Sequence, residues 1–376
     1  MKNQPRVEIL AVGMMTSLGL TAPRTAAAVR GGIDRFQSSE YIDLRGAPIT
    51  MALVPEAEMP PLDLFFSNEE QTDEDFKLPP DGRIRRPPPL THRETRMLRI
   101  AGAAFGECLA RERRIEPVPL FLATPEQLPD LPPPIGPDFL EHLATQTGIP
   151  FDTKRSRLLP RGRAGGLVAL REALDRLPLL ADGRVIVGGV DSPRDADWLD
   201  KLDEDDRIRS SEALDGFIPG EGAVFLVLGS PGTAKREKRS PLAFIDGVGL
   251  GQEKGHRYSE EVYRGDGLDA AFRALFTATP PPAPVRTVYA GLNGEHFNTK
   301  EWGVSFIRHS ERFIEGFRLE HPADCLGDLG AALAPALLAL AAIGLEQGYR
   351  KSPCLVWASS DLEDRGAALL SSGATP

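Results

Sequence analysis

The residues of this chain whose types and spacing could carry chemistry are its cysteines and one glycine-rich run. Three cysteines are present, Cys108, Cys325 and Cys354. They are too few and too scattered for a disulfide framework or a Cys-rich zinc site, which indicates a reducing compartment. The run Gly247–Gly251 lacks the spacing and the ribose-binding acid of a dinucleotide fingerprint, so it predicts a glycine turn after a strand. We therefore expect no metal and no cofactor.

The charge balance argues against two classes of partner. The 376 residues include 44 Lys and Arg against 54 Asp and Glu, which gives a formal net charge of −10. Such a charge argues against a nucleic-acid binder and against a polybasic membrane-surface protein. The apolar fraction of 41% can fill a substantial core.

No segment has the pattern of an export or membrane signal. The first apolar run, Val7–Gly13, is too short for a signal-peptide core and predicts a buried strand. The longest apolar stretch, Ala331–Leu345, is shorter than the roughly 18 residues that a transmembrane helix needs. We expect a cytoplasmic protein with no membrane contact.

One long segment interrupts the regular pattern. Between Ala47 and Leu90 the sequence is first acidic and then basic (Arg83, Arg85, Arg86), with Leu64-Phe65-Phe66 between the two parts. We expect a long excursion over the surface, because such a stretch in a compact domain is usually either functional or disordered. A solvated loop and a docking surface both remain open.

The remaining chain alternates predicted strands and helices. The predicted helix Leu329–Glu346 is apolar on nearly every face, so it must be covered on every face and belongs at the centre of a layered protein. Two α/β halves that share a central helical layer are therefore expected. Lys201–Arg209 predicts a solvated turn. The predicted strands are Val7–Val12, Leu120–Ala123, Arg157–Leu159, Arg184–Val190, Ala223–Leu228, Leu242–Val248, Val285–Ala290, Cys354–Ala358 and Gly366–Leu370. The other predicted helices are Ala22–Arg30, His92–Arg113, Ala164–Leu177, Leu268–Phe276 and Thr299–Phe317.

Several of these segments resemble the thiolase-like superfamily and, within it, the β-ketoacyl synthases. Val7–Gly19 resembles their opening strand and glycine turn, and Gly188–Ser192 resembles the strand after their nucleophile helix. The most specific match is Asp-Gly-Phe-Ile-Pro-Gly-Glu-Gly-Ala at Asp215–Ala223, which is similar to the turn before the last strand of their first half. Gly327–Ala332 resembles the start of their Gly-His-x-x-Gly-Ala-Ala helix.

The resemblance implies an α/β, five-layered αβαβα fold with two pseudo-repeated halves. We place these halves at residues 1–230, which include the excursion at about 47–90, and at 240–376. It also implies a homodimer, with the strand Arg184–Val190 bordering the subunit interface.

The catalytic Cys-His-His set that the resemblance implies is missing. When Gly166–Ala173 is matched to the nucleophile helix, Arg163 stands in place of the cysteine, and arginine is no nucleophile. Asn293 replaces the first histidine and Gly327 the second, with Asp328 beside it. Ser359–Glu363 replaces the family's C-terminal glycine-rich loop. We expect no catalytic residue at these three positions.

Two residues could supply displaced chemistry. Cys325 lies close to the Gly327 position and could be a displaced nucleophile, although buried cysteine commonly acts as a small apolar residue. His296 follows Asn293 by three residues and could be a displaced base or an ordinary loop histidine.

Arg163 itself requires a partner, because a guanidinium at the start of a helix faces the positive end of the helix dipole. Asp328 and Glu295 adjoin the former histidine positions, and in this fold both loops converge on the nucleophile turn. We predict that Arg163 pairs with Asp328 or Glu295 and closes the former acyl pocket as a structural clamp.

The sequence therefore favours a catalytically inactive β-ketoacyl synthase-like protein that acts as a scaffold or adaptor. It resembles the thiolase-like accessory proteins of type VI secretion effector modules, which implies an effector, a chaperone or a secretion-spike protein as partner. The alternative is an acyl-processing enzyme with a displaced nucleophile, or a non-catalytic chain-length-factor-like subunit of a ketosynthase.

Overall fold

A computed structural model describes residues 6–63, 90–110, 112, 117–180 and 183–373. Its main feature is one ten-stranded sheet made of two halves with the same topology. The strand order is β5-β4-β6-β7-β1 in the first half and β10-β9-β11-β12-β8 in the second. In each half the first three strands of this order are parallel and the next two pairings are antiparallel. The pseudo-repeat expected from the sequence is confirmed.

The elements of the first half run to the end of β7 and the helical turn α6. A short antiparallel pairing between β1 and β8 joins this half to the second. The bounds in the first half are β1 Val7–Thr16, α1 Ala22–Arg30, β2 Gln37–Ile42, β3 Pro48–Met51, α2 His92–Ala110, β4 Leu120–Thr124, α3 Phe139–Thr147, β5 Arg157–Pro160, α4 Gly165–Arg176, β6 Arg184–Asp191, α5 Ala196–Glu204, β7 Gly222–Gly229 and α6 Thr233–Arg236. Those in the second half are β8 Ala243–Gln252, α7 Asp266–Ala278, β9 Val285–Ala290, α8 His296–Arg308, β10 Phe313–Glu320, α9 Ala323–Leu326, α10 Leu333–Glu346, β11 Cys354–Ser359 and β12 Asp364–Ser371.

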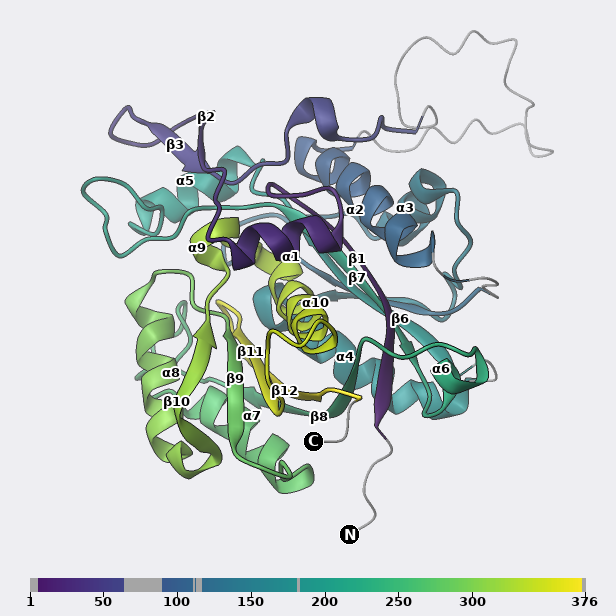
Figure 1. Cartoon of the computed structure of the whole chain (residues 1–376). Coiled ribbons are helices and arrows are strands. Elements are labelled where there is room, and N and C mark those ends of the chain that lie inside the picture. The colour runs from purple at the N-terminus through teal and green to yellow at the C-terminus, as the bar shows by residue number, and fades with distance from the viewer. Residues whose placement is uncertain (1–5, 64–89, 111, 113–116, 181–182, 374–376) are drawn as a thin grey trace, which may run out of the picture.

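The elements form five layers. Helices α2 and α3 cover the outer face of the first half, and α7 and α8 cover the outer face of the second (Figure 1). Helices α4 and α10 lie between the two halves, and α10 contacts strands of both. Residues Leu333–Leu345 are all buried, which confirms the central position predicted for this helix. A side chain at Gly166 would overlap the ring of Pro335, so α4 and α10 approach each other closely.

The structure corrects two predicted elements. The predicted helical stretch Thr299–Phe317 ends as a helix at Arg308, and Phe313–Glu320 forms the edge strand β10 beside β9. The strand that pairs with β10 lies outside this segment, so the local periodicity could not reveal that residues 313–320 form a strand. The predicted turn Lys201–Arg209 is wrong in its first part, because α5 continues to Glu204. The sequence signal for α5 was Asp195, whose side chain caps the start of the helix by accepting a hydrogen bond from the Trp198 N–H.

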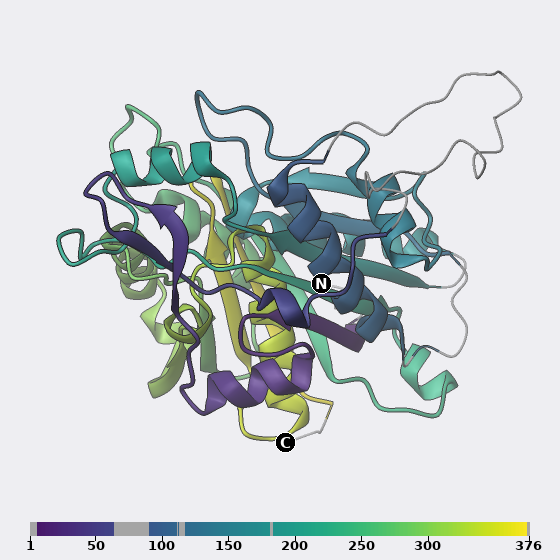
Figure 2. The same cartoon turned by 90° about the horizontal axis from the view of Figure 1, so that it is seen from above.

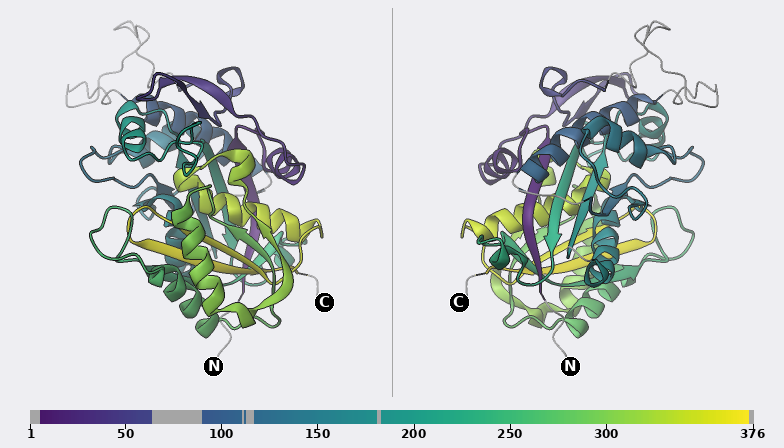
Figure 3. Two further views of the ribbon diagram at one scale, coloured as in Figure 1. Left: turned by 90° about the vertical axis from the view of Figure 1, so that its left-hand side faces the viewer. Right: turned by 90° about the vertical axis from the view of Figure 1, so that its right-hand side faces the viewer.

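The excursion predicted at about 47–90 is only partly a surface loop. Its first part contains β3, which forms a hairpin with the preceding strand β2, and Met51, Ala52, Leu53 and Val54 are buried. The inner face of this hairpin packs on α5 and on Phe217. Figure 2 shows the hairpin beside α5, and Figure 3 shows it at one end of the molecule, away from the main sheet. Leu64-Phe65-Phe66 and the basic run at 83–86 lie outside the described residues.

The strand Arg184–Val190 lies within the main sheet. It belongs to β6, which is paired on both sides, with β4 and with β7. Its backbone groups are used within the sheet, so β6 cannot itself extend the sheet into a second copy, and its place beside a subunit interface stays a prediction. The two strands at the ends of the sheet order are β5 and β10.

Candidate functional site

The turn before α4 positions Arg163 at the centre of the molecule. Gly162 precedes it with a φ of 56°, and a Cβ there would stand 2.5 Å from Glu126 Oε1, so both conformation and space favour glycine. The N–H of Ala164 donates to Ser360 Oγ at 2.9 Å. The turn is thereby tied to the loop between β11 and β12.

Arg163 is enclosed by two carboxylates and an aromatic ring. Its Nε lies 2.6 Å from Asp328 Oδ2, and its Nη1 lies 2.8 Å from Asp361 Oδ1. The guanidinium also lies over the Phe217 ring, 5.1 Å from the centroid. Only 5% of the residue is exposed. Burial alone would lower the pKa of Arg163, but Asp328 and Asp361 raise it above its usual value, so the side chain stays charged.

The positions expected for the two histidines hold groups that complete this arrangement. Asn293 Nδ2 donates to Asp328 Oδ2 at 2.7 Å and to Glu295 Oε2 at 3.0 Å. Gly327 has a φ of 68°, and a Cβ there would stand 2.8 Å from the Ile218 carbonyl oxygen. A side chain at 327 would therefore require the backbone to move.

Glu295 is buried in the same network, but it does not pair with Arg163. It accepts two hydrogen bonds from Arg207, from Nε at 2.9 Å and from Nη2 at 3.1 Å, and it forms an ion pair with Arg257 at 2.8 Å. Of the two partners predicted for Arg163, the structure brings Asp328 into contact and leaves Glu295 with two other arginines.

Arg207, Arg257 and Asp361 are members of the site that sequence reasoning missed. Arg207 Nη1 and Nη2 lie 2.9 and 2.8 Å from the two oxygens of Asp361, and the residue is only 2% exposed. Burial would raise the pKa of Asp361, but the Arg163 and Arg207 guanidiniums hold it far below its usual range. Burial and the charge of Arg207 lower the pKa of Arg257. The available signals were an arginine eight residues before the Asp-Gly-Phe turn and an aspartate in the altered C-terminal loop.

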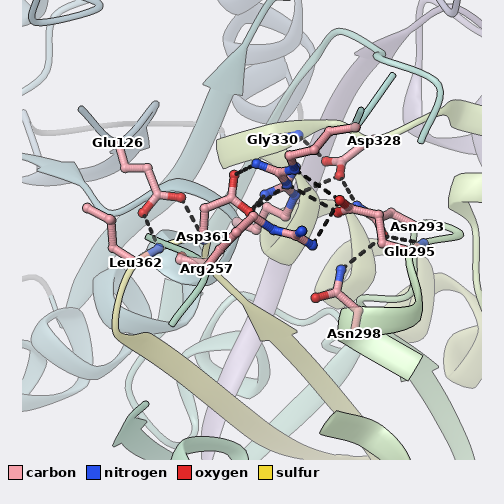
Figure 4. A network of polar contacts seen from close by, with 12 residues as sticks. Glu126, Arg257, Asn293, Glu295, Asn298, Asp328, Gly330, Asp361 and Leu362 are labelled. Carbon is pink, nitrogen blue, oxygen red and sulfur yellow. Dashed lines mark hydrogen bonds and ion pairs between the residues drawn. The ribbon is translucent and has the colours of Figure 1, made fainter. Parts of the chain in front are cut away.

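The network balances its charges in a small volume (Figure 4). Three guanidiniums, from Arg163, Arg207 and Arg257, face three carboxylates, from Asp328, Asp361 and Glu295. Because each buried charge has an opposite charge in contact, the large desolvation cost of burying these groups is offset. The Phe217 ring lies close to two of the cations, with the Arg207 guanidinium 5.4 Å from its centroid.

Glu126 closes one end of the network. Its carboxylate accepts the N–H of Asp361 at 2.8 Å and the N–H of Leu362 at 3.2 Å, so it holds the loop between β11 and β12. Burial and the neighbouring Asp361 charge raise the pKa of Glu126 to about 7. This carboxyl therefore changes its charge near neutral pH, whereas Asp361 remains ionised.

The candidates for displaced chemistry lie apart from this network. Cys325 is buried in the apolar core, where burial and the charge of Asp324 raise the pKa of its thiol. Cys108 and Cys354 are fully buried, and burial raises the pKa of both thiols. His296 begins α8 with its side chain 86% exposed, and its Nδ1 lies 3.3 Å from Asp215 Oδ1. None of the four has the environment of an activated nucleophile or a buried base.

Two further findings limit the chemistry available to the described part of the chain. No group of three or more His, Cys, Asp or Glu side chains there could hold a metal ion. No described helix combines the length and the apolar character needed to cross a membrane. The arginine and carboxylate network can bind charges and fix loops, but it contains no group that could form an acyl thioester.

The comparisons with known proteins give the class of fold. No protein-family model and no curated protein sequence matches this chain. Among solved structures, the ketosynthase from module 6 of the Bacillus subtilis 168 bacillaene synthase aligns with a TM-score of 0.73 and 13% identity, over 99% of this chain and 72% of that one. The ishigamide ketosynthase/chain length factor aligns with a TM-score of 0.73 and 14% identity, over 99% and 100%.

A third similar structure shows a ketosynthase with a partner protein. It is the AntDE:AntF assembly, a type II polyketide synthase acyl-carrier protein in complex with its ketosynthase, which aligns with a TM-score of 0.72 and 15% identity over 98% of this chain and 100% of that one. At this level of identity the likeness concerns the fold alone. The chain has the thiolase-like ketosynthase fold, as the sequence motifs predicted.

Proposed function

We propose that this protein is a catalytically inactive member of the ketosynthase fold that acts as a scaffold or adaptor for other proteins. The observation that carries the proposal is that Arg163, the residue matched to the family's nucleophile, is buried in the turn before α4 in contact with Asp328 and Asp361. A charged guanidinium cannot attack a thioester, and replacing it by water or substrate would remove the countercharge that it gives to two buried carboxylates.

The same contacts support a structural role for the former site. Arg163 joins the turn before α4 to the loop before α10 and to the loop after β11, three segments far apart in the sequence. In this proposal Arg163 and Asp328 form a clamp, and Arg207 and Arg257 extend it through Glu295 and Asp361. In the same proposal, the clamp closes the former acyl pocket.

The partner class rests on the resemblance of the sequence motifs to accessory proteins of type VI secretion effector modules. On this basis the partner would be an effector, its loading chaperone or a secretion-spike protein. Co-expression of the chain with each class, followed by purification of a defined complex, tests this assignment. A complex with an acyl carrier protein alone would contradict it.

Intact-mass analysis after incubation with acyl thioesters tests catalytic inactivity. We expect no acyl adduct and no burst of acyl transfer, because the described residues include no cysteine or histidine in the environment of an activated nucleophile. The variant Cys325→Ala is the control. An adduct on the native chain that this variant loses would establish a displaced nucleophile and overturn the proposal.

A second candidate function is a chain-length-factor-like subunit, and the fold similarity to the ishigamide ketosynthase/chain length factor is consistent with it. Both functions share an inactive site but differ in the partner. Increased condensation by an intact ketosynthase on addition of this chain would support the subunit role. The adaptor role predicts no effect on condensation.

We also propose that the chain forms a homodimer. Within the described sheet, β5 has a free edge, since it pairs only with β4. Two copies could pair through such edges around a two-fold axis. Light scattering at micromolar concentration should give twice the chain mass, and a monomer mass would rule out this assembly.

A further inference from the structure

One end of the molecule combines exposed apolar side chains with a dense group of exposed carboxylates. Seven large apolar side chains of the described residues are more than half exposed, and three of them, Ile42, Leu44 and Leu214, lie on the β2–β3 hairpin or in the loop after α5. Arg45 brings these segments together, because it forms ion pairs with Asp206 at 2.7 Å and with Glu212 at 3.3 Å.

The charge of this end is strongly negative. Helix α5 presents Asp197, Asp200 and Glu204 at helical spacing on its exposed side, while Leu199 and Leu202 face the core. Seven acidic residues between 197 and 215 are exposed, against Arg209 as the one exposed base of that span and Arg45 on the hairpin, which pairs with two of the seven. These seven are Asp197, Asp200, Glu204, Asp205, Asp206, Glu212 and Asp215.

The same segment is anchored from beneath by the arginine network. Arg207 and Phe217 are almost completely buried, and both belong to the loop whose outer residues carry the carboxylates and Leu214. The hairpin packs on this loop through Ile49, Met51 and Leu53. The surface is therefore fixed before any partner arrives, which lowers the entropic cost of binding.

We propose that the β2–β3 hairpin, α5 and residues 205–215 form a docking face for a Lys/Arg-rich segment of a partner protein that also carries apolar side chains. This inference rests on the adaptor role and names the chemistry of its partner. Cationic groups would pair with the carboxylates, and apolar groups would cover Ile42, Leu44 and Leu214. A second copy of this chain is a poor occupant, because a two-fold contact would bring the acidic face against itself. An anionic lipid surface would be repelled for the same reason.

A labelled synthetic peptide of lysine and leucine, designed as an amphipathic helix, serves as the probe. Fluorescence anisotropy should show binding that weakens as salt rises. The double variant Asp200→Asn with Glu204→Gln should weaken binding about three- to tenfold, since each exposed charge pair contributes modestly. Leu44→Ser with Leu214→Ser should weaken it by a similar factor at all salt concentrations.

Matched variants elsewhere on the surface make the test specific. Glu315→Gln with Glu346→Gln removes two exposed charges, and Leu179→Ser removes one exposed apolar side chain; these residues lie on β10, at the end of α10 and just after α4, which are not part of the docking face. Neither should change the affinity, and all variants should melt like the native chain. Equal weakening by the control variants, or no binding of the peptide, would overturn the proposal.

Two measurements separate this inference from its alternatives. Hydrogen exchange should slow on peptide binding at residues 38–54 and 197–215, and slowing confined to other segments would refute the docking face. Light scattering that shows Leu44→Ser with Leu214→Ser splitting a dimer would assign the face to a second copy instead. Acyl-adduct formation is measured independently, so failure of the docking face leaves the inactive site as it stands.

Discussion

Replacing Arg163 with alanine is the most direct perturbation of the buried network. The change removes the ion pairs to Asp328 and Asp361 and the contact with Phe217, at a residue that is 5% exposed. Removing one partner of a buried ion pair costs on the order of 3–5 kcal/mol, because the other charge stays buried without its counterion.

The structure places the expected loss at the lower end of this range. Asp328 would keep hydrogen bonds from Asn293 Nδ2 and from the Gly330 N–H, and Asp361 would keep both contacts with Arg207. We expect a loss of about 3 kcal/mol in unfolding free energy. For a chain of this length the melting temperature should fall by about 4 °C, given an unfolding entropy of about 2.1 cal/mol/K per residue.

Arg161→Ala is the matched control in thermal melts. Arg161 lies two residues away and also forms ion pairs, with Glu363 and Asp364, but its side chain is 48% exposed. Exposed pairs contribute about 0–1 kcal/mol, so this variant should melt within about 1 °C of the native chain. A double-mutant cycle with Asp328→Asn should then give a coupling of about 1 kcal/mol or more with Arg163→Ala. Equal melting temperatures of Arg163→Ala and Arg161→Ala would refute the clamp. Additive effects of Arg163→Ala and Asp328→Asn on the unfolding free energy would also refute it.

Three further predictions address protonation, thiol reactivity and packing. Burial raises the pKa of Glu126 to about 7 in the folded state, so its contribution to stability is present below its unfolded pKa and is lost as pH rises through 7. In denaturant titrations, Glu126→Gln should therefore flatten the pH dependence of the unfolding free energy between about pH 5 and 8. The lowered pKa of Asp361 acts with the opposite sign, since its contribution is present above its unfolded pKa and is lost only in strong acid. Ellman's reagent should modify none of the cysteines in the native protein and all three after unfolding in guanidinium chloride, because all three are buried; rapid modification of one thiol in the native protein would contradict this. Gly166→Ala should destabilise the folded chain by about 1–3 kcal/mol, because the new methyl group would overlap with Pro335. Gly106 in α2 has open space around it, so Gly106→Ala should be neutral or stabilising. Equal melting temperatures of the two variants would disprove the close packing of α4 on α10.

The sequence by itself determined the class of fold and the centre of the molecule. Alternating apolar runs predicted most strands of the sheet, and an apolar helix at Leu329–Glu346 could be stable only if covered on all sides. Local patterns sufficed for the strands and the central helix, because the apolar spacing of an element shows which of its faces are buried. That Arg163, Asn293 and Gly327 meet around one point was implied by the resemblance of the motifs to the β-ketoacyl synthases.

The tertiary structure decided which charges meet. Arg163 and Asp328 are 165 residues apart in the chain, and Arg207 and Asp361 are 154 apart. No periodicity links such positions. Taken alone, the sequence around each arginine is typical of a solvent-exposed loop. Likewise β10 and β3 are strands only because β9 and β2 lie beside them. Long-range pairing satisfies backbone and side-chain groups that the local sequence leaves open, so only the folded chain assigns their partners.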